Sequence, residues 1–394
     1  MKKVESRRSE LPFEKSEYER RMSALRERMA ENGIEVMLVT SPTNIYYLTG
    51  YSAYSFYAPQ FLVIPRDDDL LFVNRSIDKP GVQETTWLED ERIRPYGEEY
   101  IDHYVNYQEQ KHPVDFLIDV LRAEGLASKV LGMELDDYYC RAFYYRNLAE
   151  RLSGAEIRNQ TQIVPRIYLR KSEPEIAYMK EAARIVEVGM EKAIETIRAG
   201  ARENEVAAEV LHSLVKNGSS MPSFPPLLQT TAAPHITWTD SRINQGTSVS
   251  VEIAGCKERY HAPLCRTVIV DEEDSPVVRK AKDVIDRQMS AHEKALETVK
   301  PGIRAEEVAI EANKVFAERS SRVGYPAGLG FPPDWGERTA SFQSGDRTIL
   351  KPNMTFHMIS TLTEPFLMEF SETIRVTEEG AEVMTDFPRK LFVN

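Results

Sequence analysis

The sequence has few cysteines, no long apolar run and no excess of positive charge. Only three of its 394 residues are cysteines (Cys140, Cys256 and Cys265), and they lack both the C-x-x-C spacing of metal sites and the even count of a disulfide scaffold. No stretch approaches the ~18 apolar residues of a membrane span, and the charged N-terminal segment lacks the apolar centre of a secretion signal. These absences predict a cytoplasmic protein that is neither secreted nor embedded in a membrane.

The charge balance is acidic. Lys and Arg total 50 against 62 Asp and Glu, which gives a formal net charge of −12. A protein that binds nucleic acid through phosphates needs a basic surface, so this composition argues against nucleic acid as a partner. An acidic surface instead suits a ligand that carries positive charge.

The length predicts two or three domains, and the residue pattern changes once. Up to about residue 160, helical periodicity alternates with short apolar strands such as 35–39 and 60–65, as in a small three-layer α/β domain. At Ser172, a serine followed three residues later by Glu175 predicts the start of a long amphipathic helix. We therefore predict two domains, residues 1–168 and 169–394.

The second domain contains an internal repeat. Residues 195–209 (ETIRAGARENEVAAE) recur at an offset of 102 as residues 297–311 (ETVKPGIRAEEVAIE), with eight of fifteen positions identical. In each copy a long helix is predicted to end near a glycine, Gly200 or Gly302, with a second helix just after it. Two such units predict a pseudo-symmetric α+β domain with central strands, outer helices and a ligand site in the groove between the halves.

A predicted strand at 246–256 carries a carboxylate on its polar face. The alternation places Val249, Val251 and Ile253 on one face and Ser248, Ser250 and Glu252 on the other. On this pattern alone, Glu252 either faces solvent or lines a cleft in which its pKa is shifted for function.

Three further segments offer groups for acid/base chemistry. His235 lies in TTAAPHITWTD, close to Trp238, and is either a surface histidine or a general acid/base. The stretch 324–342, rich in Gly, Pro and aromatic residues, is long enough to be a functional loop. Near the C-terminus, Glu369 and Glu372 are three residues apart on a predicted strand, so at most one of them should face a given site.

Other reactive side chains carry weaker signals. His261 and His357 are candidate donors, but no His-x-x-x-His or Asp-x-Asp spacing supports a metal cluster. Cys265 has no adjacent base in the sequence, so we do not assign it the role of a nucleophile.

Several segments follow one another in an order that a known family shares. They are SPTNIYYLTGY at 41–51, RKSEPEIAYMKEAARI at 170–185, the repeated helix unit, and IRVTEEGAEVMT at 374–385. This order resembles the pita-bread family, which includes methionine aminopeptidase, prolidase, Xaa-Pro aminopeptidase and creatinase. The resemblance implies a creatinase-type N-terminal domain at 1–168, a pita-bread catalytic domain at 169–394, and a cytoplasmic homodimer with each N-terminal domain near the partner's active site.

The metal-binding members of this family hold two ions with two aspartates, a histidine and two glutamates. The resemblance places these ligands, in chain order, at Glu252, Pro263, Tyr325, Ile359, and either Glu369 or Glu372. Most of the ligands are lost, and a site for two ions needs several oxygen and nitrogen donors. The resemblance therefore implies an enzyme with neither a metal nor another cofactor.

A narrower resemblance lies within this family. APHITWTD at 233–240, VEIAGCKERYHAPLCRT at 251–267 and the stretch 324–342 resemble the ectoine hydrolases, the metal-free group that opens a cyclic amidine. The implied partner is a small zwitterionic substrate, ectoine or hydroxyectoine, and the implied product is an N-acetylated 2,4-diaminobutyrate.

For such a substrate the residues themselves suggest catalytic roles, and the resemblance adds that His235 stands at the position of the catalytic histidine of creatinase. Glu252 would pair with the amidinium and act either as a nucleophile or as a base for water. His235 would be the general acid/base that protonates the departing nitrogen. A C-terminal carboxylate, Glu369 or Glu372, would bind the substrate cation.

The expected substrate-binding residues are Trp238, Phe56, Tyr57, Tyr325 and Arg338, of which Phe56 and Tyr57 follow from the resemblance of YSFYAP at 54–59 to a creatinase segment. Trp238, Phe56 and Tyr57 are either walls of the pocket, where aromatic faces would stack on the amidinium, or ordinary core residues. Tyr325 would donate a hydrogen bond where the family has a histidine, or would simply fill that space. Arg338 would clamp the substrate carboxylate, unless it is an exposed loop arginine.

Three alternatives remain open. The chain could be another small-molecule C–N hydrolase or lyase of the same fold, or a metallopeptidase with unusual ligands. It could also be an inactive pita-bread module that binds another protein, although such a module would have no reason to keep an acidic residue at 252 together with His235.

Overall fold

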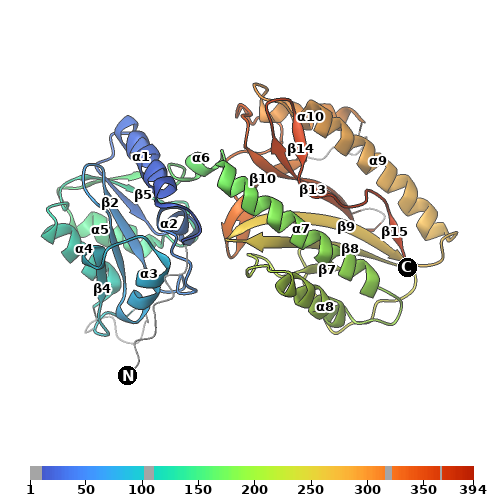
Figure 1. The fold of residues 1–394 in the computed structure, drawn as a ribbon, viewed down its shortest axis with the longest axis horizontal. Helices are drawn as coiled ribbons and strands as arrows, with labels where there is room; N and C mark the ends of the chain where they lie inside the picture. Colours follow the sequence, from blue (N-terminus) through green and yellow to red (C-terminus); the bar gives the residue numbers. More distant parts are fainter. Residues whose placement is uncertain (1–10, 102–110, 316–321, 364–365) are drawn as a thin grey trace. The chain divides into compact units, whose positions relative to one another are not determined.

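A computed structural model describes residues 11–101, 111–315, 322–363 and 366–394. The chain divides into two compact units, Met1–Ile167 and Tyr168–Asn394, which Figure 1 shows. The first ten residues, which contributed to the prediction that no secretion signal is present, lie outside the described residues. Within the described ranges, no helix is both long and apolar enough to cross a membrane.

Unit 1 is built on a six-stranded mixed sheet with the strand order β4-β3-β2-β1-β5-β6. Its strands are β1 (Val36–Val39), β2 (Phe61–Pro65), β3 (Leu71–Arg75), β4 (Ile93–Tyr96), β5 (Val130–Met133) and β6 (Glu156–Asn159). Its helices are α1 (Lys15–Glu31), α2 (Pro42–Thr49), α3 (Lys79–Thr85), α4 (Pro113–Ala123) and α5 (Ala142–Arg151), and α6 (Pro165–Tyr168) spans the boundary between the units. Side chains of α4 and α5 share one apolar core with β1, β2, β3 and β5.

Unit 2 is built on a nine-stranded sheet with the order β14-β13-β12-β10-β9-β8-β7, in which β11 pairs with β10 and β15 with β9. The strands are β7 (Leu227–Gln229), β8 (Thr247–Lys257), β9 (Tyr260–Val270), β10 (Gly324–Phe331), β11 (Asp334–Gly336), β12 (Thr355–Leu362), β13 (Met368–Val376), β14 (Ala381–Val383) and β15 (Phe392–Val393). The helices are α7 (Glu173–Thr196), α8 (Glu203–Lys216), α9 (Pro276–Thr298) and α10 (Ala305–Val315). The predicted α+β class is confirmed.

The internal repeat corresponds to two helix pairs with the same connection. Gly200, between α7 and α8, and Gly302, between α9 and α10, both have positive φ, 86° and 89°. The N–H of Gly200 donates to the carbonyl of Ile243 at 2.8 Å, and the N–H of Gly302 donates to that of Leu350 at 2.9 Å. The predicted duplication is therefore confirmed down to equivalent backbone hydrogen bonds.

Each helix pair covers one part of the sheet (Figure 1). Side chains of α7 and α8 form a core with Val249, Val251 and Ile253 of β8, as the alternation predicted. Side chains of α9 and α10 form another core with Phe356 and Met358 of β12. The alternate residues of these strands face away from the helices and are the ones that build the site.

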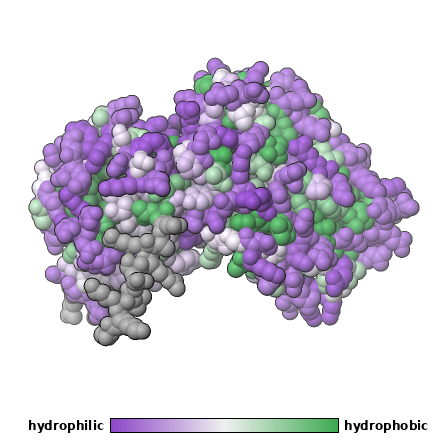
Figure 2. All heavy atoms as spheres, viewed as in Figure 1, coloured by the Kyte–Doolittle hydropathy of each residue, from purple (hydrophilic) through white to green (hydrophobic). Residues whose placement is uncertain are grey.

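Hydrophilic residues cover most of the visible face of each unit (Figure 2). This distribution agrees with the charged composition and with apolar cores inside each unit.

Candidate active site

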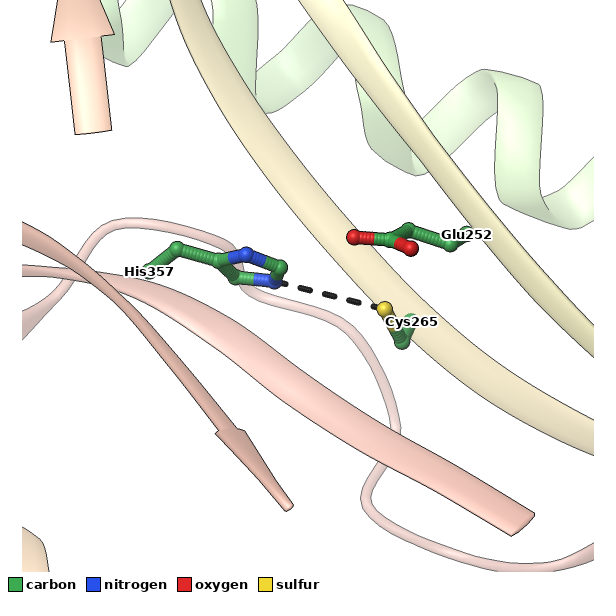
Figure 3. A group of neighbouring side chains, drawn as sticks. All are labelled: Glu252, Cys265 and His357. Atoms are coloured by element: carbon green, nitrogen blue, oxygen red, sulfur yellow. Dashed lines mark hydrogen bonds between the residues drawn. The ribbon is translucent and has the colours of Figure 1, made fainter. Parts of the chain in front are cut away.

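The site begins in the middle of β8, where Glu252 points away from the helix-covered core. Glu252 lies directly opposite Cys265 of β9, and both residues are buried. His357 of β12 completes the group, and one ligand atom from each of the three side chains lies within 4.8 Å of the others. Figure 3 shows the three side chains converging from three strands.

Hydrogen bonds hold the ring of His357 on both sides. Its Nε2 lies 2.7 Å from Ser371 Oγ, and its Nδ1 lies 2.9 Å from Tyr325 Oη. Tyr325 Oη also accepts a hydrogen bond of 3.1 Å from Trp335 Nε1. Burial lowers the pKa of His357 to about 3, so the ring is neutral at physiological pH.

Glu252 differs from Glu369 and Glu372 in the contacts of its carboxyl group. Among the residues that the structure describes, no hydrogen bond or ion pair to its carboxylate is found. Burial, together with the negative charges of Glu369 and Asp334, raises the pKa of Glu252 to about 8. A cation that entered the site would pair with this carboxylate and favour its ionised form.

Glu369 of β13 is the second carboxylate of the site. Its Oε2 accepts hydrogen bonds from Gln229 Nε2 at 2.7 Å and from Ser250 Oγ at 2.9 Å, and its Oε1 accepts one from Thr361 Oγ1 at 3.2 Å. Burial raises the pKa of Glu369, and these hydrogen bonds oppose the increase. Glu369 is thus oriented by neutral donors, and its charge is not neutralised by an ion pair within the described part of the chain.

Glu372 lies on the opposite face of β13. Arg389 donates two hydrogen bonds to its carboxylate, at 2.9 and 2.8 Å, and Nε2 of His292 on α9 lies 2.9 Å from it. Burial opposes ionisation, but the hydrogen bond and charge of His292 and those of Arg389 lower the pKa of Glu372. The sequence did not decide which of the two C-terminal carboxylates faces the site. In the structure Glu369 lies near Glu252, whereas Glu372 forms buried ion pairs with His292 and Arg389.

A pocket of about 540 Å³ opens beside these groups. Its lining includes Phe224, His235, Arg322, Tyr325, Asp334 and Arg338. Tyr325 connects the pocket to the cluster of Glu252, Cys265 and His357, because its side chain lines the pocket while its hydroxyl contacts His357. Three residues predicted separately, His235, Tyr325 and Arg338, therefore share one pocket.

His235 lies in an exposed loop and has a positive φ of 63°. Its backbone N–H donates to Gln229 Oε1 at 2.5 Å, and the same glutamine side chain donates to Glu369. Because a backbone N–H can only donate, this contact fixes which end of the Gln229 amide faces Glu369. The position of the His235 loop and the orientation of Glu369 are therefore coupled through one side chain.

Two arginines and an aspartate line the outer part of the pocket. Arg338 Nε lies 4.0 Å from Asp334 Oδ2, and half of the Arg338 side chain is exposed. The guanidinium of Arg322 lies 4.8 Å from the centre of the Tyr325 ring, which is a cation–π distance. Burial raises the pKa of Asp334, while the charges of Arg322 and His235 oppose this increase.

The three predicted aromatic walls lie elsewhere. Trp238 is half-buried and packs against the core between α7, α8 and the sheet, so the structure favours the core interpretation. Phe56 and Tyr57 belong to unit 1, where they line a separate pocket of about 230 Å³ together with Tyr138 and Tyr139. Their approach to a partner's active site stays a prediction.

Sequence reasoning missed several members of the site. Ser371 was detectable, because it shares a face of β13 with Glu369. His357 was noted without a role, and Cys265 was considered only as a nucleophile. Burial raises the pKa of the Cys265 thiol well above its usual value, which agrees with the prediction that Cys265 is not a nucleophile. Nothing in the sequence around Gln229 signalled its contact with Glu369.

The residues present do not fit the family's site for two metal ions. At the five positions that the resemblance assigns, Pro263 and Ile359 offer no ligand atom, and the hydroxyl of Tyr325 is engaged by His357 and Trp335. Glu252 and Glu369 are the carboxylates that remain. Two carboxylates are too few donors for two bridged ions, so no step of the mechanism is assigned to a metal.

Comparisons with known proteins agree with this architecture. Residues 21–170 match the creatinase/prolidase N-terminal domain, and residues 177–378 match metallopeptidase family M24. The prolidase of Pyrococcus horikoshii, a solved structure, covers 94% of this chain and 99% of its own with a TM-score of 0.77. At 22% sequence identity, that likeness shows the fold alone.

Curated relatives extend the match to full length. An ectoine hydrolase from Halomonas elongata is 35% identical over 402 residues, which cover 97% of this chain and 98% of that protein. A creatinase from a Bacillus species is 26% identical, over 95% of this chain and 92% of its own. The chain therefore belongs to metallopeptidase family M24 and is a hydrolase that acts on C–N bonds.

Proposed function

We propose that this enzyme hydrolyses the cyclic amidine ectoine to an N-acetylated 2,4-diaminobutyrate without a metal. The observation that carries the proposal is the pair of buried carboxylates, Glu252 and Glu369, neither of which forms an ion pair with a described residue. Such a site costs stability unless its ligand supplies positive charge. The full-length similarity to an ectoine hydrolase supports an amidinium as that ligand.

Burial sets the charge state of the site. In the free enzyme, Glu252 has a pKa of about 8 and is largely protonated at neutral pH. When the amidinium binds, its positive charge stabilises the carboxylate, so a proton leaves Glu252 as the substrate enters. The ionised carboxylate then lies against the electrophilic amidine carbon, in a site with little water to solvate it.

Two routes for the bond changes are open. In the first, Glu252 takes a proton from water, the water oxygen adds to the amidine carbon, and a ring C–N bond breaks. In the second, the Glu252 carboxylate adds to the same carbon, the C–N bond breaks, and water releases the covalent adduct. In both routes His235 supplies the proton to the departing nitrogen, and the net change is the addition of one water molecule.

The remaining residues bind and orient the substrate. Glu369, fixed by Gln229, balances positive charge in the transition state. Arg338 or Arg322 on the outer wall of the pocket binds the carboxylate of the zwitterion. Hydroxyectoine differs by one hydroxyl group, so it is the alternative substrate for the same pocket.

We also propose a cytoplasmic homodimer in which Phe56 and Tyr57 approach the partner's site. The support is the family resemblance and the exposure of Tyr57, whose side chain is free of the unit 1 core. Size-exclusion chromatography with light scattering tests the dimer directly, since a monomer would contradict it.

The proposed hydrolysis is tested by following ectoine with proton NMR after the purified enzyme has been treated with a strong chelator. Ring opening at an undiminished rate is expected. Activity that disappears and returns with an added divalent ion would contradict the metal-free route. No product under either condition would overturn ectoine as the substrate.

A further inference from the structure

We propose that Glu252, Cys265 and His357 bind one thiophilic divalent ion such as Zn²⁺, and that this ion inhibits the enzyme by occupying Glu252. The inhibition rests on the proposed function, whereas the binding itself does not. The site differs from the family's site for two ions, because Cys265 and His357 do not stand at any of its ligand positions.

The geometry is close to that of a bound ion. Cys265 Sγ lies 4.0 Å from His357 Nε2 (Figure 3), and all three ligand atoms lie within 4.8 Å of one another. Zn–S and Zn–N distances of about 2.3 and 2.0 Å place sulfur and nitrogen roughly 3.5 Å apart around a tetrahedral ion. Small side-chain rotations are therefore enough to close the site.

The donors match the ion. A thiolate, a neutral imidazole and a carboxylate are the ligands that Zn²⁺ prefers, and three of them leave a fourth position for water. Mg²⁺ and Ca²⁺ prefer six or more oxygen ligands, so this group should discriminate against them. Cys265 releases its thiol proton to solvent as the S–Zn bond forms, and no oxidation or reduction takes place.

The surroundings of the three residues also favour an ion. The contact between His357 Nδ1 and Tyr325 Oη holds the ring, as second-shell hydrogen bonds do around metal-binding histidines. Ser371 Oγ, at 2.7 Å from Nε2, occupies the place that the ion would take at that nitrogen and must give it up. Glu252 is more than nine-tenths buried with no partner of its own among the described residues, so its carboxyl loses its proton and pairs with a cation that enters the site.

Inhibition follows from the shared carboxylate. An ion held by Glu252 neutralises the charge that the amidinium needs and blocks the atom that attacks or activates water. Substrate and ion should therefore exclude each other, and inhibition by Zn²⁺ should be competitive with ectoine.

Binding is tested first, with the metal alone and the chelator-treated full-length enzyme. Titration with Cd²⁺ should give the ultraviolet thiolate–cadmium absorption at one ion per chain, and calorimetry with Zn²⁺ should give the same stoichiometry. Cys265→Ser should abolish the absorption and weaken Zn²⁺ binding by roughly 100-fold, since it removes the thiolate ligand. Cys256→Ser is the matched control, because Cys256 is an equally buried cysteine on the neighbouring strand.

Wild-type enzyme supplies a test that needs no variant. Zn²⁺ should inhibit ectoine hydrolysis competitively, a chelator should reverse the inhibition, and Mg²⁺ should have no effect. Equal cadmium absorption in wild type and Cys265→Ser, or no binding at all, would overturn the site while leaving the metal-free hydrolysis intact. Binding without any hydrolysis of ectoine would keep the site and overturn the proposed function, and activation by Zn²⁺ would show that the ion is not an inhibitor.

Discussion

The two faces of strand β13 each carry a buried glutamate, and the two carboxylates have different kinds of partner. Glu372 faces α9 and contacts His292 and Arg389, so its charge is neutralised by the protein itself. Glu369 faces Glu252, and the side chains that donate hydrogen bonds to its carboxylate are neutral. The pKa of Glu372 is lowered and those of Glu369 and Glu252 are raised.

The difference shows which carboxylates serve the fold and which serve a ligand. A buried ion pair satisfies its own charges and needs nothing from outside. An ionised buried carboxylate without a cation lowers the stability of the free protein. Groups with such an electrostatic cost are common at functional sites. The contrast between Glu372 and Glu252 therefore gives opposite expectations for activity and for stability.

The largest expected effect is on activity at Glu252. Glu252→Gln keeps the size of the side chain but removes both the nucleophile and the base, so kcat/KM for ectoine should fall by roughly 10³-fold or more. The free energy of unfolding at pH 8 should not decrease, because the buried charge is gone. Steady-state kinetics and urea denaturation of the same preparation measure both quantities, and unchanged turnover would remove Glu252 from the mechanism.

The reverse outcome is expected at Glu372. Glu372→Gln leaves His292 and Arg389 without their anion, so the free energy of unfolding should fall by about 2–3 kcal/mol. Under conditions in which the variant remains folded, it should keep kcat within a few fold of wild type. A loss of activity as large as that of Glu252→Gln, without loss of stability, would show that Glu372 takes part in catalysis.

His235 should show a smaller kinetic effect. His235→Ala should lower kcat by about 100-fold, which is a common cost of losing a general acid/base. His212→Ala is the matched control, because His212 is an exposed histidine on α8 in the same unit. Equal kcat values for the two variants would show that His235 only lines the pocket.

The smallest and most diagnostic kinetic effect is in the pH profile. Glu252 must be ionised to react and its pKa is about 8 in the free enzyme, so kcat/KM should rise with pH up to about 8 and then level off. Substrate binding lowers this pKa, so kcat should rise with pH and level off at a lower pH than kcat/KM does. A kcat/KM that is flat between pH 6 and 8 would contradict an uncompensated Glu252.

Local patterns predicted much of the fold. The repeat at 195–209 and 297–311 predicted both helix pairs and the glycines between them, since each pair is a contiguous segment. The alternation around Glu252 predicted which face of β8 is core. These features depend on residues within about 15 positions of one another, which is the range over which periodicity carries information.

The rest of the site depends on register between strands far apart in sequence. Cys265 meets His357 and Ser371 because β9, β12 and β13 are brought together by the fold, and no local pattern encodes that meeting. Trp238 looked like a pocket wall because it lies near His235 in sequence, but its ring packs on the other side against the helix-covered core. Proximity along a loop did not give the direction of the side chain.

The most direct test of the central claim is the pH dependence of stability in wild type and Glu252→Gln. A carboxyl whose pKa is raised from about 4.5 in the unfolded chain to about 8 in the folded one costs progressively more stability as pH rises between those values. Wild type should therefore lose stability relative to Glu252→Gln between pH 5 and 8, with no further difference above that range, and ectoine should recover the loss in wild type alone. A difference that stays constant with pH, or a wild type that gains stability relative to the variant as pH rises, would show that the protein already supplies a cation to Glu252.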